Sequence, residues 1–231
     1  MRCLCWASLV MRMNKTKVYV SDTKFLKDKS VFGELYQTVS PNRQRKIDAF
    51  LFEKDKQLCL AAELILKKAL SHAGIDHYTV KRGALGKPYL EKERICFNLS
   101  HSEEMVMCAI SSKEVGCDVE KVTDIDLEIA KRFFYTTEYE AIKAAQSEAE
   151  RRNMFFRLWT LKESFMKATG LGMKLPLDSF RIGIEGGKLT VCQNVNQEKY
   201  FFKEYDFNNG YKYAVCSLTD KFGDAELVSL V

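Results

Sequence analysis

The chain has 231 residues, of which 46% are hydrophobic and 29% are charged, the composition of a globular protein with one large domain or two smaller ones. Its 36 Lys and Arg against 31 Asp and Glu give a net charge of +5, which suits a phosphate-bearing or acidic partner but is too small to indicate nucleic-acid binding. No apolar run approaches the roughly 20 residues of a membrane span, so we expect a cytoplasmic protein without membrane contact.

The eight cysteines form no C-x-x-C pair, and four of them lie inside apolar runs. This pattern is typical of small buried hydrophobic residues in a reducing compartment, and it lacks the clustered spacing of a zinc site. The four residues concerned are Cys96, Cys108, Cys117 and Cys216.

Residues 1–12 precede the segment "MNKTKVYV", which leads directly into a predicted strand at 17–20. The apolar part of this opening, Cys3 to Met11, is short and lacks a clear cleavage site for a signal peptide. We therefore expect residues 1–12 to be a dispensable extension.

The next elements alternate between helix and strand. Ser40 and Pro41 suit the start of a helix, apolar residues then recur at helical spacing, and Gly74 suits its end, so one helix is predicted over 40–74. A strand, turn and strand follow over 79–90. Three further strands, separated by gaps of hairpin length, are expected to form an antiparallel meander; they cover 95–102, 105–112 and 115–122.

The second part of the chain repeats this order. Residues 137–168 are predicted to be helical, as one helix or two, and hairpins follow over 180–193 and 199–218, the second with an Asn-Gly turn. A strand, helices and a run of strands thus occur twice. We predict an α+β fold of two similar halves, 13–115 and 116–231, packed as one unit with the active site between them.

Two carboxylates mark the end of the strand "VGCDVEKV". Asp118 and Glu120 lie two residues apart, so on a strand they share a face, and like charges this close require a positive partner. In "RLWTLKESFMKATG", Glu163 and Lys167 lie four apart and share a helix face. This second pair is also compatible with a surface ion pair. Three carboxylates with a lysine suit Mg²⁺ bound together with a phosphate ligand.

Further residues suit an anion. Ser100 and His101 lie in "FNLSHS", whose hydroxyls, backbone N–H groups and imidazole can hold a phosphate, although its serines could equally satisfy their own turn. Lys87 follows a glycine turn. Arg43 and Lys46 lie in the first turns of a predicted helix, where backbone dipoles favour anions, although such charges also occur on a solvated face.

The ordered segments "GKPYL", "FNLSHS", "GCDVEKV" and "FRLWTLKESFMKATGLGMKLPLDSF" together resemble a known family. The chain is similar to the 4'-phosphopantetheinyl transferases of the long, surfactin-synthetase-activating type. Their signature pair, G-[IC]-D-[IV]-E and W-[ST]-x-K-E-[SA]-x-x-K, is intact, and the resemblance covers residues 14 to 220. It implies two similar α+β halves related by a pseudo-two-fold axis.

The resemblance also implies a reaction. Phosphopantetheine would pass from coenzyme A to a serine of an apo acyl or peptidyl carrier protein, with release of adenosine 3',5'-bisphosphate. The implied metal is Mg²⁺, with Mn²⁺ as a substitute, bound by Asp118, Glu120 and Glu163. Glu163 and Lys167 would be catalytic. Glu138 would be a further candidate for metal ligand or base, and a metal-bound water a further candidate for the base. Coenzyme A would be bound by Arg43, Lys46, Lys87, Ser100, His101, Asp118 and Lys167.

Several points stay open at this stage. The family often places a basic residue and a hydroxyl near the 3'-phosphate of coenzyme A where this chain has Leu58 and Cys59. A Mg²⁺-dependent phosphodiesterase or nuclease, and an inactive coenzyme A-binding protein, are the alternative functions. We expect a monomer, and an acidic carrier protein docking near residues 132–142 with Phe133 and Phe134 exposed or nearly so.

Overall fold

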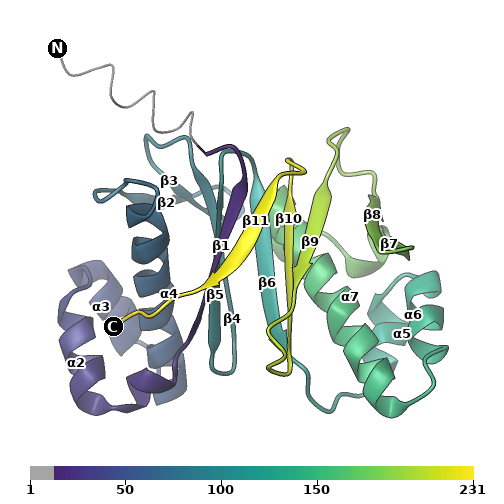
Figure 1. The fold of residues 1–231 in the computed structure, drawn as a ribbon, viewed down its shortest axis with the longest axis horizontal. Helices are drawn as coiled ribbons and strands as arrows, with labels where there is room; N and C mark the ends of the chain where they lie inside the picture. Colours follow the sequence, from purple (N-terminus) through teal and green to yellow (C-terminus); the bar gives the residue numbers. More distant parts are fainter. Residues whose placement is uncertain (1–12) are drawn as a thin grey trace.

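The computed structural model describes residues 13–231, so the expected extension at 1–12 lies outside the described part of the chain. Two larger sheets carry the fold (Figure 1). Their strand orders are β11-β1-β5-β4 and β6-β10-β9. The strands are Thr16–Asp22 (β1), Cys96–Ser102 (β4), Met105–Ser111 (β5), Val115–Lys121 (β6), Phe201–Tyr205 (β9), Tyr211–Ser217 (β10) and Phe222–Leu227 (β11).

The chain passes through the same order of elements twice. A strand is followed by three helices, by a two-stranded hairpin and by two more strands, and in each sheet the last of these strands lies between the other two (β1-β5-β4 and β6-β10-β9). This repetition confirms the predicted α+β fold of two similar halves. The helices are Lys29–Gln37 (α2), Pro41–Asp48 (α3), Glu53–Ser71 (α4), Glu128–Phe133 (α5), Thr136–Lys143 (α6) and Glu148–Thr169 (α7).

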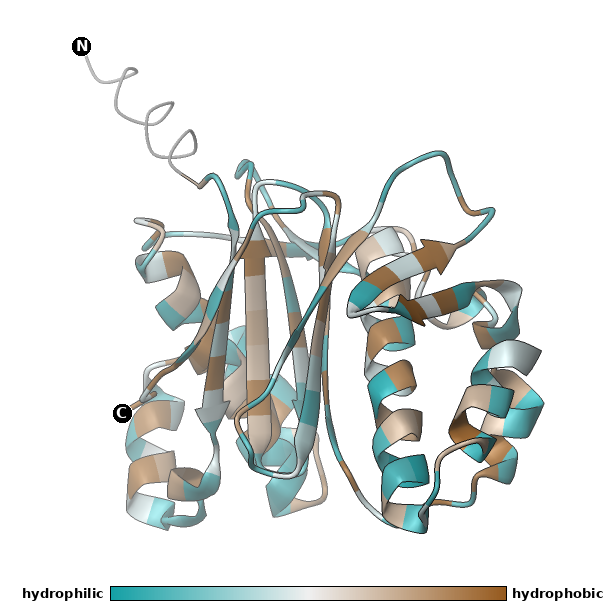
Figure 2. Ribbon diagram, turned by 45° about the vertical axis from the view of Figure 1, so that its right-hand side comes forward, coloured by the Kyte–Doolittle hydropathy of each residue, from teal (hydrophilic) through white to brown (hydrophobic). Residues whose placement is uncertain are grey.

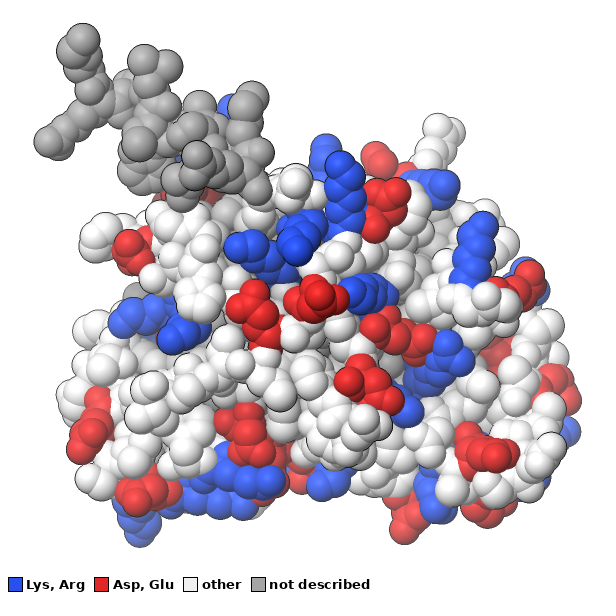
Figure 3. Space-filling view, viewed as in Figure 1, with Lys and Arg blue, Asp and Glu red and all other residues white. Residues whose placement is uncertain are grey.

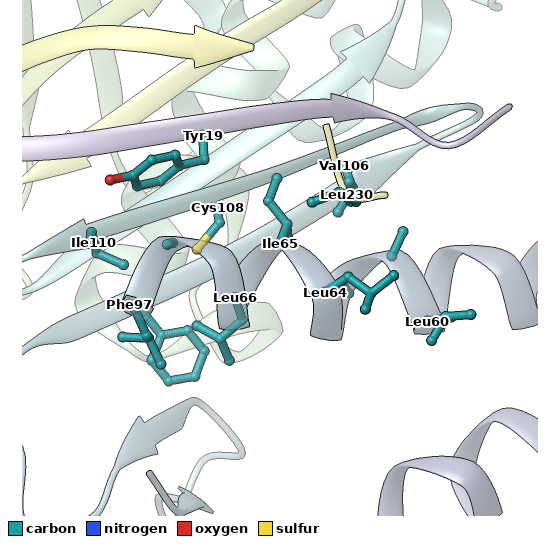
Figure 4. Packing of buried hydrophobic residues seen from close by; sticks show 14 of the residues in the cluster. Tyr19, Leu60, Leu64, Ile65, Leu66, Phe97, Val106, Cys108, Ile110 and Leu230 are labelled. Carbon is teal, nitrogen blue, oxygen red and sulfur yellow. The ribbon is translucent and has the colours of Figure 1, made fainter. Parts of the chain in front are cut away.

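The two sheets lie face to face, and one long helix covers the outer face of each. α4 packs on β1, β4 and β5, and α7 packs on β6 and β10 (Figures 1 and 2). Side chains alternate along the strands. Tyr19 faces the core with α4 (Figure 4), whereas Val18 and Val20 face the core between the sheets. The strands in the middle of each sheet therefore bury apolar side chains on both faces. The packing on their outer faces positions α4 and α7.

The predicted meander is wrong in its third strand. β4 and β5 pair antiparallel as expected, but β6 pairs with β10. The reason is that both edges of β5 are already occupied, one by β4 and the other by β1. β6 instead lies beside β4, where the two halves meet.

The single helix predicted over 40–74 is also wrong, because α3 ends at Asp48 and α4 begins at Glu53. Leu51 and Phe52 between them are highly exposed, although their spacing continues the apolar pattern. The helical region at 137–168 divides into α6 and α7, one of the two predicted possibilities. Helix α2 and strand β11 were not predicted.

Strand β11 carries the end of the chain back to the first half. It pairs parallel to β1, and the Val228 N–H extends the contact by donating to the Val20 carbonyl at 2.9 Å. This differs from the expectation that residues 116–231 form the second half alone. β11 lies along the edge of β1 that does not pair with β5, just as β4 lies along the edge of β6 that does not pair with β10.

The remaining predicted elements are present. The 79–90 segment forms the antiparallel pair Val80–Arg82 (β2) and Pro88–Leu90 (β3), and Arg181–Glu185 (β7) pairs with Lys188–Cys192 (β8). Cys108, Cys117 and Cys216 are buried as predicted, whereas Cys96 is half-buried; all four are free thiols. Within residues 13–231 no helix combines the length and the apolar character needed to cross a membrane.

Candidate active site

Strand β6 presents its two carboxylates toward α7. Val115, Cys117 and Val119 face the core between the sheets, so the alternate residues Asp118 and Glu120 face the other way. The strand approaches the helix very closely at Gly116, where a Cβ atom would collide with the backbone of Ser164 and Ala168. The predicted shared face of the two carboxylates is confirmed, and the glycine explains how close to α7 they lie.

Helix α7 supplies the other two charged groups. Ser147 caps its start by accepting from the Glu150 N–H, and Gly170, with φ of 75°, ends it in the left-handed conformation that favours glycine. Glu163 and Lys167 lie one turn apart on the face that meets β6. Phe165 and Met166, which lie between them in the sequence, belong to the apolar core.

The structure brings six of the predicted site residues into one pocket of about 320 Å³. The pocket opens where β4, β6 and α7 meet. Leu99 and Trp159 complete its wall. The predicted residues that line it are Ser100, His101, Asp118, Glu120, Glu163 and Lys167.

Lys167 is the positive partner that the paired carboxylates require. Its Nζ lies 2.5 Å from Asp118 Oδ1 and donates to Ser100 Oγ at 3.1 Å. The Ser100 hydroxyl also donates to Asp118 Oδ1 at 2.7 Å and accepts from the Val119 N–H at 3.3 Å. One donor and two acceptor sites are all that a hydroxyl has. Ser100 could therefore contact coenzyme A only by giving up one of these bonds.

Burial, together with the neighbouring charges, sets the protonation of the site. Burial and then the nearby Asp118 raise the pKa of Glu120 to about 7, against the opposing effects of Ser102 and Lys167. Burial also raises the pKa of Glu163, although Lys167 opposes it. Burial acts to lower the pKa of Lys167, but the attraction of Asp118, Cys117 and Glu163 together outweighs burial and the pKa is raised. The site is therefore a buried carboxylate cluster with one firmly charged lysine.

The donor set fits a hard divalent cation such as Mg²⁺. Among the described residues, no group of three His, Cys, Asp or Glu side chains is already arranged to hold a metal. The side chain of Asp118 is nonetheless almost fully buried, and its Oδ2 has no hydrogen-bond partner. An unpartnered buried carboxylate oxygen beside two more carboxylates is the oxygen-rich, negatively charged setting that Mg²⁺ prefers.

Arg43 and Lys46 lie elsewhere, in a larger cavity of about 1100 Å³ that is lined by α3, α4, β2 and the segments before β2 and after β3. Arg43 Nη2 lies 2.5 Å from a carboxylate oxygen of Glu63, and Arg43 Nη1 donates to Cys59 Sγ at 3.6 Å. Cys59 thus helps to fix Arg43.

Lys87 lines neither pocket. Its Nζ lies 2.6 Å from Glu114 Oε2 and donates to the Val115 and Ala168 carbonyls at 3.2 and 3.1 Å. The side chain thereby ties β3 to the start of β6 and the end of α7. The structure gives Lys87 this bracing contact in place of the expected neighbourhood of Ser100 and His101.

The candidacy of Glu138 as a metal ligand or base is wrong in this structure. Glu138 and Lys162 form a buried pair at 2.7 Å, with side chains only 2% and 0% exposed. The Glu138 oxygens also accept from the Ile182 and Tyr135 N–H groups. No oxygen is left for a cation or a substrate proton. This carboxylate joins α6, α7 and β7.

Two other points differ from the sequence analysis. Phe134 is buried and stacks on Phe155, so only Phe133 of the expected exposed pair reaches the surface. Ser102 is not among the predicted site residues, yet it donates to Glu120 at 2.7 Å from within β4. The signal for Ser102 was the alternation of polar residues at 98, 100 and 102, which is a strand period.

Comparison with known proteins identifies a family for this chain. The profile of the 4'-phosphopantetheinyl transferase superfamily matches residues 114–216, and that of the 4'-phosphopantetheinyl transferase N-terminal region matches residues 27–113. The chain therefore belongs to the 4'-phosphopantetheinyl transferase superfamily, in its long Sfp type. It is an enzyme of this transferase class.

Individual relatives span most of the chain. The 4'-phosphopantetheinyl transferase gsp of Aneurinibacillus migulanus is 32% identical over 88% of this chain and 86% of its own length. The Sfp enzyme of Bacillus subtilis is 34% identical over 80% of this chain and 84% of its own. Among solved structures, the holo-[acyl-carrier-protein] synthase of Thermotoga maritima matches 45% of this chain and 61% of its own, with 20% identity and a TM-score of 0.40.

Proposed function

We propose that this enzyme transfers 4'-phosphopantetheine from coenzyme A to a serine hydroxyl of an apo acyl or peptidyl carrier protein, and that the transfer depends on Mg²⁺. In this reaction the serine oxygen bonds to the β-phosphorus and the bond to the adenosine 3',5'-bisphosphate leaving group breaks. The observation that carries the proposal is the convergence of Asp118, Glu120, Glu163 and Lys167 in one pocket at the junction of the halves.

Asp118, Glu120 and Glu163 would hold the Mg²⁺. When bound, the ion neutralises charge on the pyrophosphate and on the leaving oxygen. The unpartnered Oδ2 of Asp118 supports this assignment, because a cation would satisfy it.

The remaining groups do their work through position and charge. Lys167 stays protonated, and Asp118 holds its ammonium group at the wall of the pocket, where it can stabilise the transferring phosphoryl group. Glu163 also lines the pocket and is half-buried. We therefore assign it the role of the base that accepts the proton of the attacking serine hydroxyl. No protein nucleophile is needed for a direct transfer.

Coenzyme A has separate places for its two ends in this proposal. The pyrophosphate lies in the carboxylate pocket beside His101, and the adenosine end with its 3'-phosphate extends toward the larger cavity with Arg43 and Lys46. Glu63 and Cys59 fix the orientation of Arg43, and the carboxylate of Glu63 also neutralises part of its positive charge. We expect Lys46, which has no ion-pair partner among the described residues, to contribute more to phosphate binding.

The carrier protein would dock beside the pocket on the second half. Phe133 and Tyr135 are exposed at the α5–α6 junction, and Phe134 between them packs against Trp159, which lines the pocket. An acidic carrier suits the net charge of +5. On the face in Figure 3, basic and acidic side chains are interspersed, which argues against the continuous basic groove of a nuclease.

Mass spectrometry of candidate apo-carrier proteins, incubated with coenzyme A, Mg²⁺ and the enzyme, tests the proposal. The expected result is a gain of one phosphopantetheine on a serine, lost when Mg²⁺ is chelated and lost again in Asp118→Ala. A carrier with its serine changed to alanine is the matched control and should stay unmodified. Hydrolysis of plasmid DNA without any carrier modification would overturn the proposal in favour of a nuclease.

A further inference from the structure

Three polar side chains of β4 take the place of a backbone partner for β6. Asn98 Oδ1, Ser100 Oγ and Ser102 Oγ each accept the backbone N–H of the residue 19 positions later, at 2.9, 3.3 and 3.2 Å. The donors are Cys117, Val119 and Lys121. We call these three side chains the β4 ladder.

The ladder fixes how the two sheets align. β6 is an edge strand of its sheet, and its outward N–H groups would be buried without a partner if these side chains were absent. The constant offset means that β4 and β6 run in the same direction in a single register. A slip of one residue would replace the ladder residues by Leu99 and His101, which face the other way.

Two members of the ladder also hold a carboxylate. Ser100 donates to Asp118 Oδ1 and Ser102 donates to Glu120 Oε2, each at 2.7 Å. Hydrogen bonds to an ionised carboxylate are shorter and stronger than neutral ones. Ser100 is bonded to Lys167 as well, so it belongs to the charged cluster itself, whereas Ser102 contacts only Glu120 among the residues that line the pocket.

We propose that Ser102 is a positioning residue, which orients Glu120 for Mg²⁺ only when β4 and β6 are in register. With Oε2 held by Ser102, Oε1 receives no hydrogen bond from any residue in 13–231 and is free to bind a cation. The ladder then makes assembly of the metal site depend on the contact between the halves. This inference rests on the proposed function, because it presumes that the carboxylates bind Mg²⁺.

A purely structural role for Ser102 predicts something different. Satisfying the Lys121 N–H needs only an acceptor and has no link to the metal. Asn98 shows the distinction within the ladder, since it makes the same backbone contact and holds no carboxylate. Ser217 offers a matched control on β10: its hydroxyl donates to the Glu114 carbonyl at 2.9 Å, at the opposite end of β6 from Glu120.

The test is Mn²⁺ binding followed by electron paramagnetic resonance, in the absence of coenzyme A, together with melting temperatures and transfer kinetics. Loss of a group that orients a metal ligand typically costs about 10–100-fold in metal affinity. We expect Ser102→Ala and Ser102→Val to raise the Mn²⁺ Kd by this factor, and Ser102→Thr, which keeps the hydroxyl, to restore it. Ser217→Ala should lower the melting temperature and leave the Kd unchanged.

The Thr and Val variants have nearly the same shape, so a difference between them reports the hydroxyl even if Ser102→Ala folds poorly. Equal Mn²⁺ affinity in these two variants would overturn the inference while the wild type still transfers phosphopantetheine. An equal loss in Ser217→Ala would overturn it too, by making the effect one of general stability. A wild-type enzyme that neither binds Mn²⁺ nor modifies a carrier would overturn the proposed function, and this inference with it.

Discussion

The two oxygens of Asp118 have different surroundings. Oδ1 receives Ser100 and Lys167, while Oδ2 is buried with no partner. Leaving a buried polar atom unpaired costs about 1–3 kcal/mol, and more for a charged group. Such costs are typical of binding sites, where the missing partner is the ligand. At the scale of single residues, Asp118 therefore carries a local cost to stability, which the proposed Mg²⁺ would relieve by binding Oδ2.

Glu163 is the residue for which the ligand and base roles can be separated. Glu163→Gln keeps the size and one oxygen but cannot accept a proton at neutral pH, so we expect transfer to slow by about 10²–10⁴-fold. The measurement is the single-turnover rate with saturating carrier, at several Mg²⁺ concentrations. Asp118→Ala is the comparison and should recover partly at high Mg²⁺ or Mn²⁺. Full recovery of Glu163→Gln at high Mg²⁺ would limit Glu163 to a ligand.

The buried pair of Glu138 and Lys162 is expected to matter for folding and not for chemistry. Breaking a buried ion pair by removing one partner costs about 3–5 kcal/mol, because the other charge is left alone. Glu138→Leu should lower the free energy of unfolding in urea by about this amount. Glu138→Leu combined with Lys162→Met should regain much of the loss. A stable Glu138→Leu variant without transfer activity would instead return Glu138 to the active site.

At the scale of elements, the distance between β6 and α7 depends on one glycine. In Gly116→Ala the new methyl group would overlap the helix backbone at Ser164 and Ala168, so the helix must move away from the strand that carries Asp118. We expect a lower melting temperature and a loss of transfer together. Thermal unfolding and the single-turnover rate measure the two effects.

Gly33 provides the control for this substitution. It lies inside α2, has no atom within 4 Å of an added Cβ, and is not in the left-handed region. Gly33→Ala should therefore stabilise the protein by about 0.4–1 kcal/mol, since it reduces the entropy of the unfolded chain. If Gly116→Ala behaved like Gly33→Ala, the close approach of strand and helix would not be required.

At the scale of the whole molecule, the last strand connects the second half to the first. β11 covers the edge of β1 that β5 leaves free, and Val228 continues the contact. A chain that ends after Lys221 should expose the β1 edge. We expect faster amide exchange at β1 in a hydrogen-exchange experiment, with β9 and β10 changed less. Unchanged exchange in β1 would mean that β11 contributes little to the first sheet.

Much of this molecule follows from the sequence alone. Strand and helix periods are local, so the hairpins, the repeated order of elements and the shared faces of Asp118 with Glu120 and of Glu163 with Lys167 could be predicted from spacing. The motif pair was sufficient to indicate the family. Ser40 and Pro41 correctly marked the start of α3, because capping also depends on a few neighbouring residues.

Only the tertiary structure decided how each polar group is used. Glu138 and Lys87 resemble site residues in the sequence, but partners from distant segments occupy them fully. β6 pairs with β10 because both edges of β5 are occupied, and Ser102 contacts Glu120 only because β4 lies beside β6. The partner of a hydrogen-bonding group or of a strand edge can come from a distant part of the chain. Which partner it has is therefore decided only in the folded structure.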